Sequence, residues 1–392
     1  MTRPIMIPLT ASTTPPPAQW RAFLELGFRP LYLLATLWGA VSIALWLYAP
    51  GWLANAAIPG LFWHAHEMLW AFIGTIAVGF LLTASATWTG QRTLRGAALG
   101  LLCLIWLAAR LCLLAPGGAL PALILDALFY LIAAAELARV IVLARNRRNY
   151  GIPLAMLALG ASHALFLGSL IQGHDPMPYF YSGFWTMALI TLLIARRVIP
   201  FFSMRAIPGL SIPMQTRSGQ WQMGLSALAI ALSLLGWHQP LAACLAALGL
   251  IALVQWIRWR PWNSRRLPLL WILYLGYAGL AVGLLSAAAY EIGLLQRAAW
   301  PVHILGLAGF SVMIIGMLTR TALGHLGRPL KASPRLVAGY ALLLAATALR
   351  LLALIPSAWS LPLLHLAGLC WILSLLNYLW QFAPMLIRPR LA

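Results

Sequence analysis

The hydrophobic pattern of the chain is a series of long apolar runs separated by short linkers. Each run has about 20 residues, the length at which a helix crosses the hydrocarbon core of a bilayer. Lipid cannot satisfy an open backbone, so spans of this kind are helices. The runs number twelve: 30–49, 64–87, 97–115, 119–143, 152–172, 178–199, 219–237, 239–257, 268–289, 300–319, 334–355 and 360–384. They predict an all-α polytopic membrane protein, with one twelve-helix domain at 30–384 between tails at 1–29 and 385–392.

Composition agrees with this pattern. Of the 392 residues, 62% are hydrophobic and only 8% are charged, with a mean hydropathy of +0.88. A soluble domain has about 25% charged residues, so the composition excludes a soluble enzyme, a disordered protein and a nucleic-acid binder. The four cysteines lie in apolar runs and form no CxxC pair, which argues against a disulfide framework or a zinc site. They are Cys103, Cys112, Cys244 and Cys370.

The net charge of +20 becomes an orientation signal once the runs are placed. If there are twelve spans, 23 of the 26 basic residues fall in the tails and alternate loops on one side of the membrane. The opposite loops hold only Arg297. Because cytoplasmic loops carry the excess of Lys and Arg, we expect both termini in the cytoplasm and the protein in a bacterial inner membrane.

Rare residues recur along the chain in a way that predicts an internal repeat. His66 recurs as His303 after 237 residues, and Arg110 recurs as Arg350 after 240. Helices 1–4 and 9–12 would be parallel copies, with helices 5–8 as a degenerate middle copy. Such an arrangement resembles the pseudo-threefold ring of the catalytic subunit of heme-copper oxidases. In that superfamily histidines on helices 2 and 10 hold heme, whereas helices 6 and 7, which carry copper ligands there, contain no histidine here.

Ionisable groups inside membrane spans are costly, so each is a candidate functional residue. Imidazoles facing each other from two helices hold a b-type heme, and His66 and His303 are the best-matched pair. Arg110 and Arg350 are candidate partners of heme propionates, because guanidinium binds carboxylates bidentately. Interfacial hydrogen bonds of these histidines and snorkelling of the arginines are the alternatives that the sequence leaves open.

A second metal, copper or another heme, has further candidate ligands in His64, His163 and His365. His64 and His66 are two residues apart, about 200° around a helix, so they cannot both face one iron. Glu67 and Asp126 are the protein carboxylates that could partner the arginines within the membrane.

Several strings of the chain are similar to a known family. They are GFRPLYLLATLWG at 27–39, WHAHEMLWAFIGTIAVGFLLTASATWTGQ at 63–91, RVIPFF at 197–202 and GMLTRTALGHLGRPL at 316–330. Together with the helix count, they make the chain resemble the NnrS family of bacterial membrane proteins. The resemblance covers nearly the whole chain and implies an inner-membrane protein that contains heme and copper. It also implies a role in nitric oxide metabolism and in resistance to nitrosative stress.

Carried over residue by residue, the resemblance draws attention to a set of positions that the motifs contain. These are His64, His66, Glu67, Arg197, Arg320 and His325. Arg196 departs from the family pattern, in which glycine is expected at that place.

Three kinds of function remain open at this point. The favoured one is a protein that binds or turns over nitric oxide at heme, with copper as a less certain second cofactor, near the periplasmic face. Whether it catalyses a reaction, and which electron donor it uses, stay open. A transporter for a small solute, a metal or heme would predict an ionisable site at mid-membrane, where His163 is the candidate. An assembly or sensor partner is the third.

Overall fold

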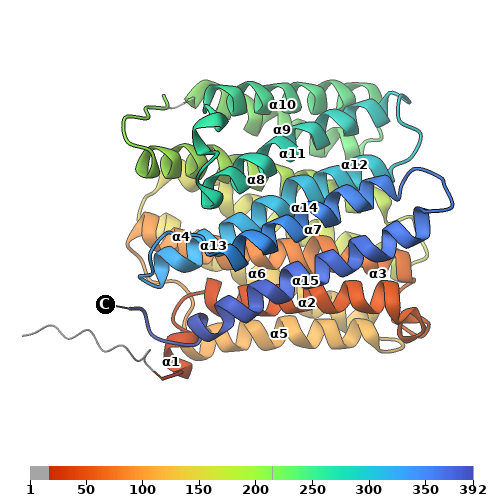
Figure 1. The fold of residues 1–392 in the computed structure, drawn as a ribbon. Helices are drawn as coiled ribbons and strands as arrows, with labels where there is room; N and C mark the ends of the chain where they lie inside the picture. The colour runs from red at the N-terminus through yellow and green to blue at the C-terminus, as the bar shows by residue number, and fades with distance from the viewer. Residues whose placement is uncertain (1–16, 214, 392) are drawn as a thin grey trace, which may run out of the picture.

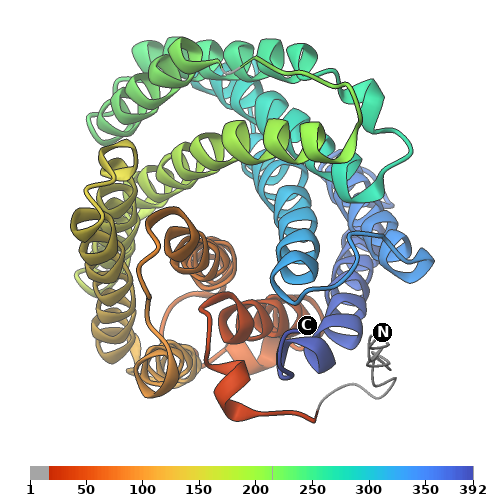
Figure 2. The ribbon, with the colours of Figure 1, turned by 90° about the vertical axis from the view of Figure 1, so that its left-hand side faces the viewer.

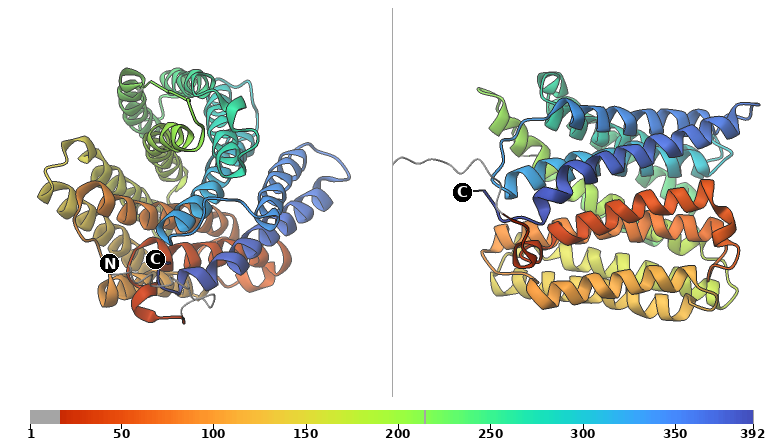
Figure 3. Two further views of the ribbon diagram at one scale, coloured as in Figure 1. Left: turned by 60° about the vertical axis from the view of Figure 1, so that its left-hand side comes forward. Right: turned by 60° about the horizontal axis from the view of Figure 1, so that its bottom comes forward.

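The computed structural model describes residues 17–213 and 215–391, and this part of the chain is a bundle of long helices that run side by side (Figures 1 and 3). The first half comprises α1 (Trp20–Phe23), α2 (Phe28–Tyr48), α3 (Gly60–His66), η2 (Glu67–Gly74), α4 (Thr75–Thr89), α5 (Gly96–Leu114), α6 (Ala119–Leu143) and α7 (Gly151–Ile171). The second half comprises α8 (Met177–Ala206), α9 (Thr216–Leu234), α10 (His238–Arg258), α11 (Pro268–Glu291), α12 (Ala299–His303), η5 (Ile304–Ser311), α13 (Val312–His325), α14 (Pro334–Leu352) and α15 (Ser360–Leu386). Short 3₁₀ turns at Pro50–Leu53, Arg147–Asn149 and Pro261–Ser264 lie in the connections.

The described chain is therefore all-α, and eleven of its helical segments are long and apolar enough to cross a membrane. The protein is a multi-pass membrane protein whose helices require a lipid bilayer. Each of the twelve predicted runs coincides with a helix, but the run at 219–237 does not qualify as a span by composition. That run is α9, which begins with the polar sequence TRSGQWQ. The prediction of twelve spans thus holds for eleven of them.

The polar residues of α9 have partners inside the bundle. The buried Gln222 accepts a hydrogen bond of 3.1 Å from Gln255 of α10 and donates one of 3.3 Å to the hydroxyl of Tyr277 in α11. α9 also packs along α8 and α10. Its polarity is thus used in packing against neighbouring helices.

Both described ends of the chain meet at one end of the bundle, near α1 (Figure 1). The backbone N–H of Gln19 donates to Ile387 O, and the buried Arg29 donates to the carbonyl oxygens of Leu386 and Arg388. A chain that returns to its starting end has made an even number of passes, so α9 makes one of them. Residues 1–16 of the predicted tail at 1–29 lie outside the described residues.

The helices differ in how deeply they lie in the bundle. Viewed along the bundle, α4, α8 and α13 lie inside a ring formed by the other helices (Figure 2). The segment Gly60–Thr89, which joins α3, η2 and α4, is 94% buried, whereas most other spans are half-buried or less. Such a central segment faces protein on nearly all sides, so its polar residues are the ones best shielded from lipid.

Two of the central segments contain a π-helical stretch directly after a histidine. η2 follows His66 and η5 follows His303, and the two stretches are 237 residues apart at both of their ends. In each, a hydroxyl at or just beyond the C-terminal end donates to the carbonyl five residues earlier. Thr75 donates to Trp70 O and Ser311 donates to Gly306 O. π-helical stretches are rare and frequently occur at functional sites.

Close helix contact fixes η5 against α11. A Cβ at Gly279 of α11 would lie 2.1 Å from the carbonyl oxygen of Ala308. Small residues allow membrane helices to approach closely where no hydrophobic effect drives them together. Gly279 therefore permits the backbone contact that positions η5 and, with it, His303.

Candidate metal centre

A cluster of ionisable side chains is fully buried near the middle of the first half of the bundle. Its members are His66, Glu67, Arg110, Asp126 and His163. They come from four helical segments, and each side chain lies several residues inside its helix. At 1.5 Å per residue, the two histidines and Asp126 lie about 9–12 Å from the helix ends opposite the arginine-rich loops. The cluster thus lies at one level, within the predicted membrane.

Three donor atoms of this cluster converge on one point. His66 Nε2 and His163 Nε2 are 2.9 Å apart, and Asp126 Oδ2 lies 3.6 Å from the first and 3.3 Å from the second. Ligands bound at about 2.0–2.2 Å to one ion are themselves separated by about 3–3.5 Å. Their spacing therefore suits a shared metal ion, and this group of three is the candidate metal site among the described residues.

The orientation of His66 is set by Glu67. His66 Nδ1 is 2.7 Å from Glu67 Oε1, which turns Nε2 toward His163 and Asp126. The indole of Trp38 donates to the other carboxylate oxygen of Glu67. A carboxylate behind the imidazole is the arrangement that fixes the tautomer of a metal-bound histidine.

Arg110 joins the two carboxylates of the cluster. Its Nη2 hydrogen-bonds Asp126 Oδ2, and its Nε is 3.4 Å from Glu67 Oε2. The guanidinium carbon also lies 5.4 Å from the ring centre of Trp106. Two carboxylates and one guanidinium leave the cluster with a net charge of −1 when both imidazoles are neutral. A buried charge of this kind requires a counter-charge, which a bound cation would provide.

Aromatic side chains enclose the two histidines. Trp70 lies 5.6 Å from His66, 5.7 Å from His163 and 4.9 Å from Phe166, measured between ring centres. Tyr130 donates a 2.8 Å hydrogen bond to Trp70 O, in the π-helical stretch. A Cβ at Gly74 would lie 2.2 Å from the Tyr130 hydroxyl, so glycine is required there for this contact.

The other predicted heme and metal ligands lie elsewhere. His64 stacks on Trp46, with ring centres 5.3 Å apart, and so faces away from His66 as the two-residue spacing predicts. His303 Nδ1 is 2.8 Å from Ala299 O. Charge interactions link His64 and His303 to Arg350. Within the described chain, no hydrogen bond or ring contact joins His303 to His66.

The remaining positions lie outside the cluster. His365 is half-buried, with its ring centre 5.5 Å from that of Tyr48. Arg320 lies 4.1 Å from the ring centre of Phe202, and the ring of His325 is 5.5 Å from Phe28. Arg197 donates to the side-chain oxygen of Asn149. These residues contact helix neighbours, and they do not approach His66.

Comparison with known proteins agrees with the motifs. A family model described as NnrS protein matches residues 22–390, which include every span and every member of the cluster. The chain belongs to the NnrS family. No curated protein sequence matches it. The convergence of His163 with His66 in this NnrS-family protein was not evident from sequence, because 97 residues separate them. Only the mid-helix position of His163 within an apolar run indicated that it has a special role.

Proposed function

We propose that this protein is a heme- and copper-binding protein of the bacterial inner membrane that acts on nitric oxide, with a copper ion held by His66, Asp126 and His163. The observation that carries the proposal is the convergence of these three fully buried donor atoms within 3.6 Å of one another. Both termini would lie in the cytoplasm, and the metal centre would lie nearer the periplasmic face.

The donor set supports an ion bound by nitrogen and oxygen. Imidazole and carboxylate suit first-row transition metals, and among these copper binds most tightly at a given site. Bound copper would supply one-electron chemistry and an open coordination position for a diatomic ligand. Glu67 would hold His66 in the ligating tautomer, and Arg110 would keep Asp126 ionised and oriented. Nitric oxide is apolar enough to reach a buried centre from the lipid without a polar channel.

The same geometry argues against heme between His66 and His163. Two axial nitrogens on opposite faces of one heme are about 4 Å apart, at about 2 Å from the iron on each side, with the macrocycle between them. The two Nε2 atoms are only 2.9 Å apart. Heme thus requires another ligand, and we assign His303. Its Nδ1 is held by Ala299 O, which leaves Nε2 as the ligating atom. Pairing of His303 with His66, as the sequence predicts, would require His66 to leave the cluster.

Arg350 supports the placement of heme near His303. It interacts electrostatically with His303 and His64, and no described carboxylate forms a salt bridge with it. A heme propionate would supply the anionic partner that this half-buried guanidinium lacks.

A metal transporter is the second candidate. It is favoured by the π-helical interruptions after His66 and His303, since discontinuous helices line the substrate sites of many transporters. The two functions differ in how long the metal stays. A cofactor remains bound at fixed stoichiometry through purification, whereas a transported ion exchanges and accumulates inside proteoliposomes.

Metal analysis and absorption spectroscopy of the protein purified in detergent test the proposal. We expect copper near one ion per chain and a Soret band from heme. His163→Gln should lower copper affinity about 10–100-fold and leave the Soret band in place, whereas His303→Gln should do the reverse. His238→Gln is the matched control, because His238 is exposed and contacts only Glu291. Wild-type copper content in His163→Gln, or copper uptake into proteoliposomes, would contradict the assignment.

A further inference from the structure

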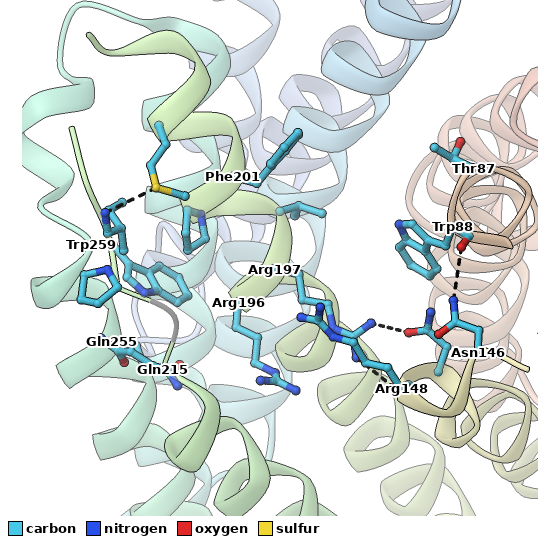
Figure 4. Close-up of a pocket in the computed structure, with 16 residues that line it drawn as sticks. Thr87, Trp88, Asn146, Arg148, Arg196, Arg197, Phe201, Gln215, Gln255 and Trp259 are labelled. Carbon is cyan, nitrogen blue, oxygen red and sulfur yellow. Dashed lines mark hydrogen bonds between the residues drawn. The ribbon is translucent and has the colours of Figure 1, made fainter. Parts of the chain in front are cut away.

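A large cavity lies away from the metal centre, at the arginine-rich end of the bundle. Its volume is about 700 Å³, within the range of ligand pockets. It is bounded by the ends of α4, α8 and α10, by the α6–α7 turn and by the segment after α8. Figure 4 shows Arg196 and Arg197 of α8 between Trp259 on one side and Trp88 on the other.

The charged groups of this cavity are all cationic. Arg148, Arg196 and Arg197 line it, and no Asp or Glu is present among its described lining residues. Arg196 has only a weak contact, 3.8 Å from its Nη2 to the sulfur of Met223, and its buried Nε has no hydrogen-bond partner. Guanidinium groups brought together without carboxylates repel one another, and an anion bound between them removes the repulsion.

The wall next to the arginines is apolar and faces outward. Phe201 is 50% exposed and Met204 is 40% exposed, although both belong to the membrane-spanning α8. Exposed side chains of a membrane span contact lipid. An occupant that satisfies both parts of the cavity has an anionic head at the arginines and an apolar chain beside α8.

We propose that this cavity binds the headgroup phosphate of an anionic phospholipid, with an acyl chain along Phe201 and Met204. Phosphate presents the oxygens that Arg binds bidentately, and the arginine-rich end places the site at headgroup level. Heme is a poorer occupant. The described lining residues include no His or Cys, and the sulfur of Met204 already accepts the N–H of Ile212. This inference goes beyond the proposed copper and heme chemistry and does not depend on it.

Thermal stability of the purified full chain in detergent provides the test. Short-chain phosphatidylglycerol, phosphatidylcholine and inorganic phosphate are titrated separately at equal concentrations. We expect saturable stabilisation by phosphatidylglycerol alone. Arg196→Gln should weaken its apparent affinity at least about tenfold, since it removes charged hydrogen bonds. Arg217→Gln, an exposed arginine of α9 that does not line the cavity, should leave the affinity unchanged.

The other outcomes decide against the proposal. Equal stabilisation by phosphatidylcholine would show that the head charge is not recognised. Equal stabilisation by inorganic phosphate would assign the cavity to a free anion and overturn the lipid. If Arg196→Gln does not fold, Arg148→Gln, an exposed lining position, replaces it. Wild-type affinity in the lining variant would overturn the role of the arginines.

Discussion

Removal of the one guanidinium in the buried cluster should destabilise the protein strongly. Arg110 is 1% exposed and forms ion pairs with Asp126 and Glu67, both at most 1% exposed. Arg110→Met keeps much of the volume but leaves two carboxylates buried without a cation. Loss of one partner of a buried ion pair costs about 3–5 kcal/mol, because the other charge remains desolvated. We expect a loss of that size in the free energy of unfolding of the metal-free protein.

The assay is reversible unfolding in mixed micelles with increasing SDS, followed by tryptophan fluorescence. Adding Asp126→Asn to Arg110→Met removes one stranded charge with little change of shape, so the double variant should recover a large part of the loss. Arg139→Gln is the control. Arg139 pairs with Glu136 at the surface, where an ion pair is worth at most about 1 kcal/mol.

A small effect would refute the reasoning. If Arg110→Met lowered the free energy of unfolding by no more than the surface control does, the two carboxylates could not both be charged in the native state. The cluster would then lack the net charge of −1 on which the cation argument depends. A double variant no more stable than Arg110→Met would equally show that Asp126 is not the charge left unpaired.

Three further outcomes are expected. Gly279→Ala should lose about 1–3 kcal/mol by overpacking against Ala308 O, whereas Gly224→Ala, with no atom within 4 Å of the new Cβ, should stabilise α9 by up to about 1 kcal/mol; SDS unfolding of both measures this. Trp38→Phe should cost about 1.5–3 kcal/mol by removing the indole bond to the Glu67 carboxylate, and a cost below 0.5 kcal/mol on the scale of neutral surface changes would show that Glu67 is neutral. A green fluorescent protein fused at the C-terminus should fluoresce and an alkaline phosphatase at the same place should be inactive, as a cytoplasmic terminus requires.

The spans were predictable from sequence because the length of an apolar run reports the thickness of the bilayer directly. The prediction was less exact at α9, where polar residues enter a helix that packs within the bundle. Gln222 finds its partners on α10 and α11. Run length and composition cannot show such partners, since they depend on which helices become neighbours. The extension of α8 beyond Pro200 to Ala206 was missed for a related reason, because proline usually marks a helix end.

The candidate site was predictable in its residue types but not in its pairings. Rarity of ionisable groups in lipid identified His66, Arg110, Asp126 and His163 one at a time. Their grouping depends on the rotation of each helix about its axis, and the π-helical stretch after His66 alters that rotation locally. The sequence match therefore led to His303 as the partner of His66, whereas the helix packing brings His163 to 2.9 Å from it.

The two halves of the chain carry opposite charge preferences at corresponding places. Both π-helical stretches follow a histidine, and their shared spacing of 237 residues supports the predicted repeat. In the first half, Glu67 and Asp126 surround the arginine. At the same offsets along the second half stand Ile304 and Ala367, so Arg350 is left without an acidic partner. A duplicated scaffold that keeps both carboxylates favours a cation, and one that loses them favours an anion. This divergence explains why one histidine suits a metal ion while its counterpart suits heme, whose propionates bring the missing negative charge.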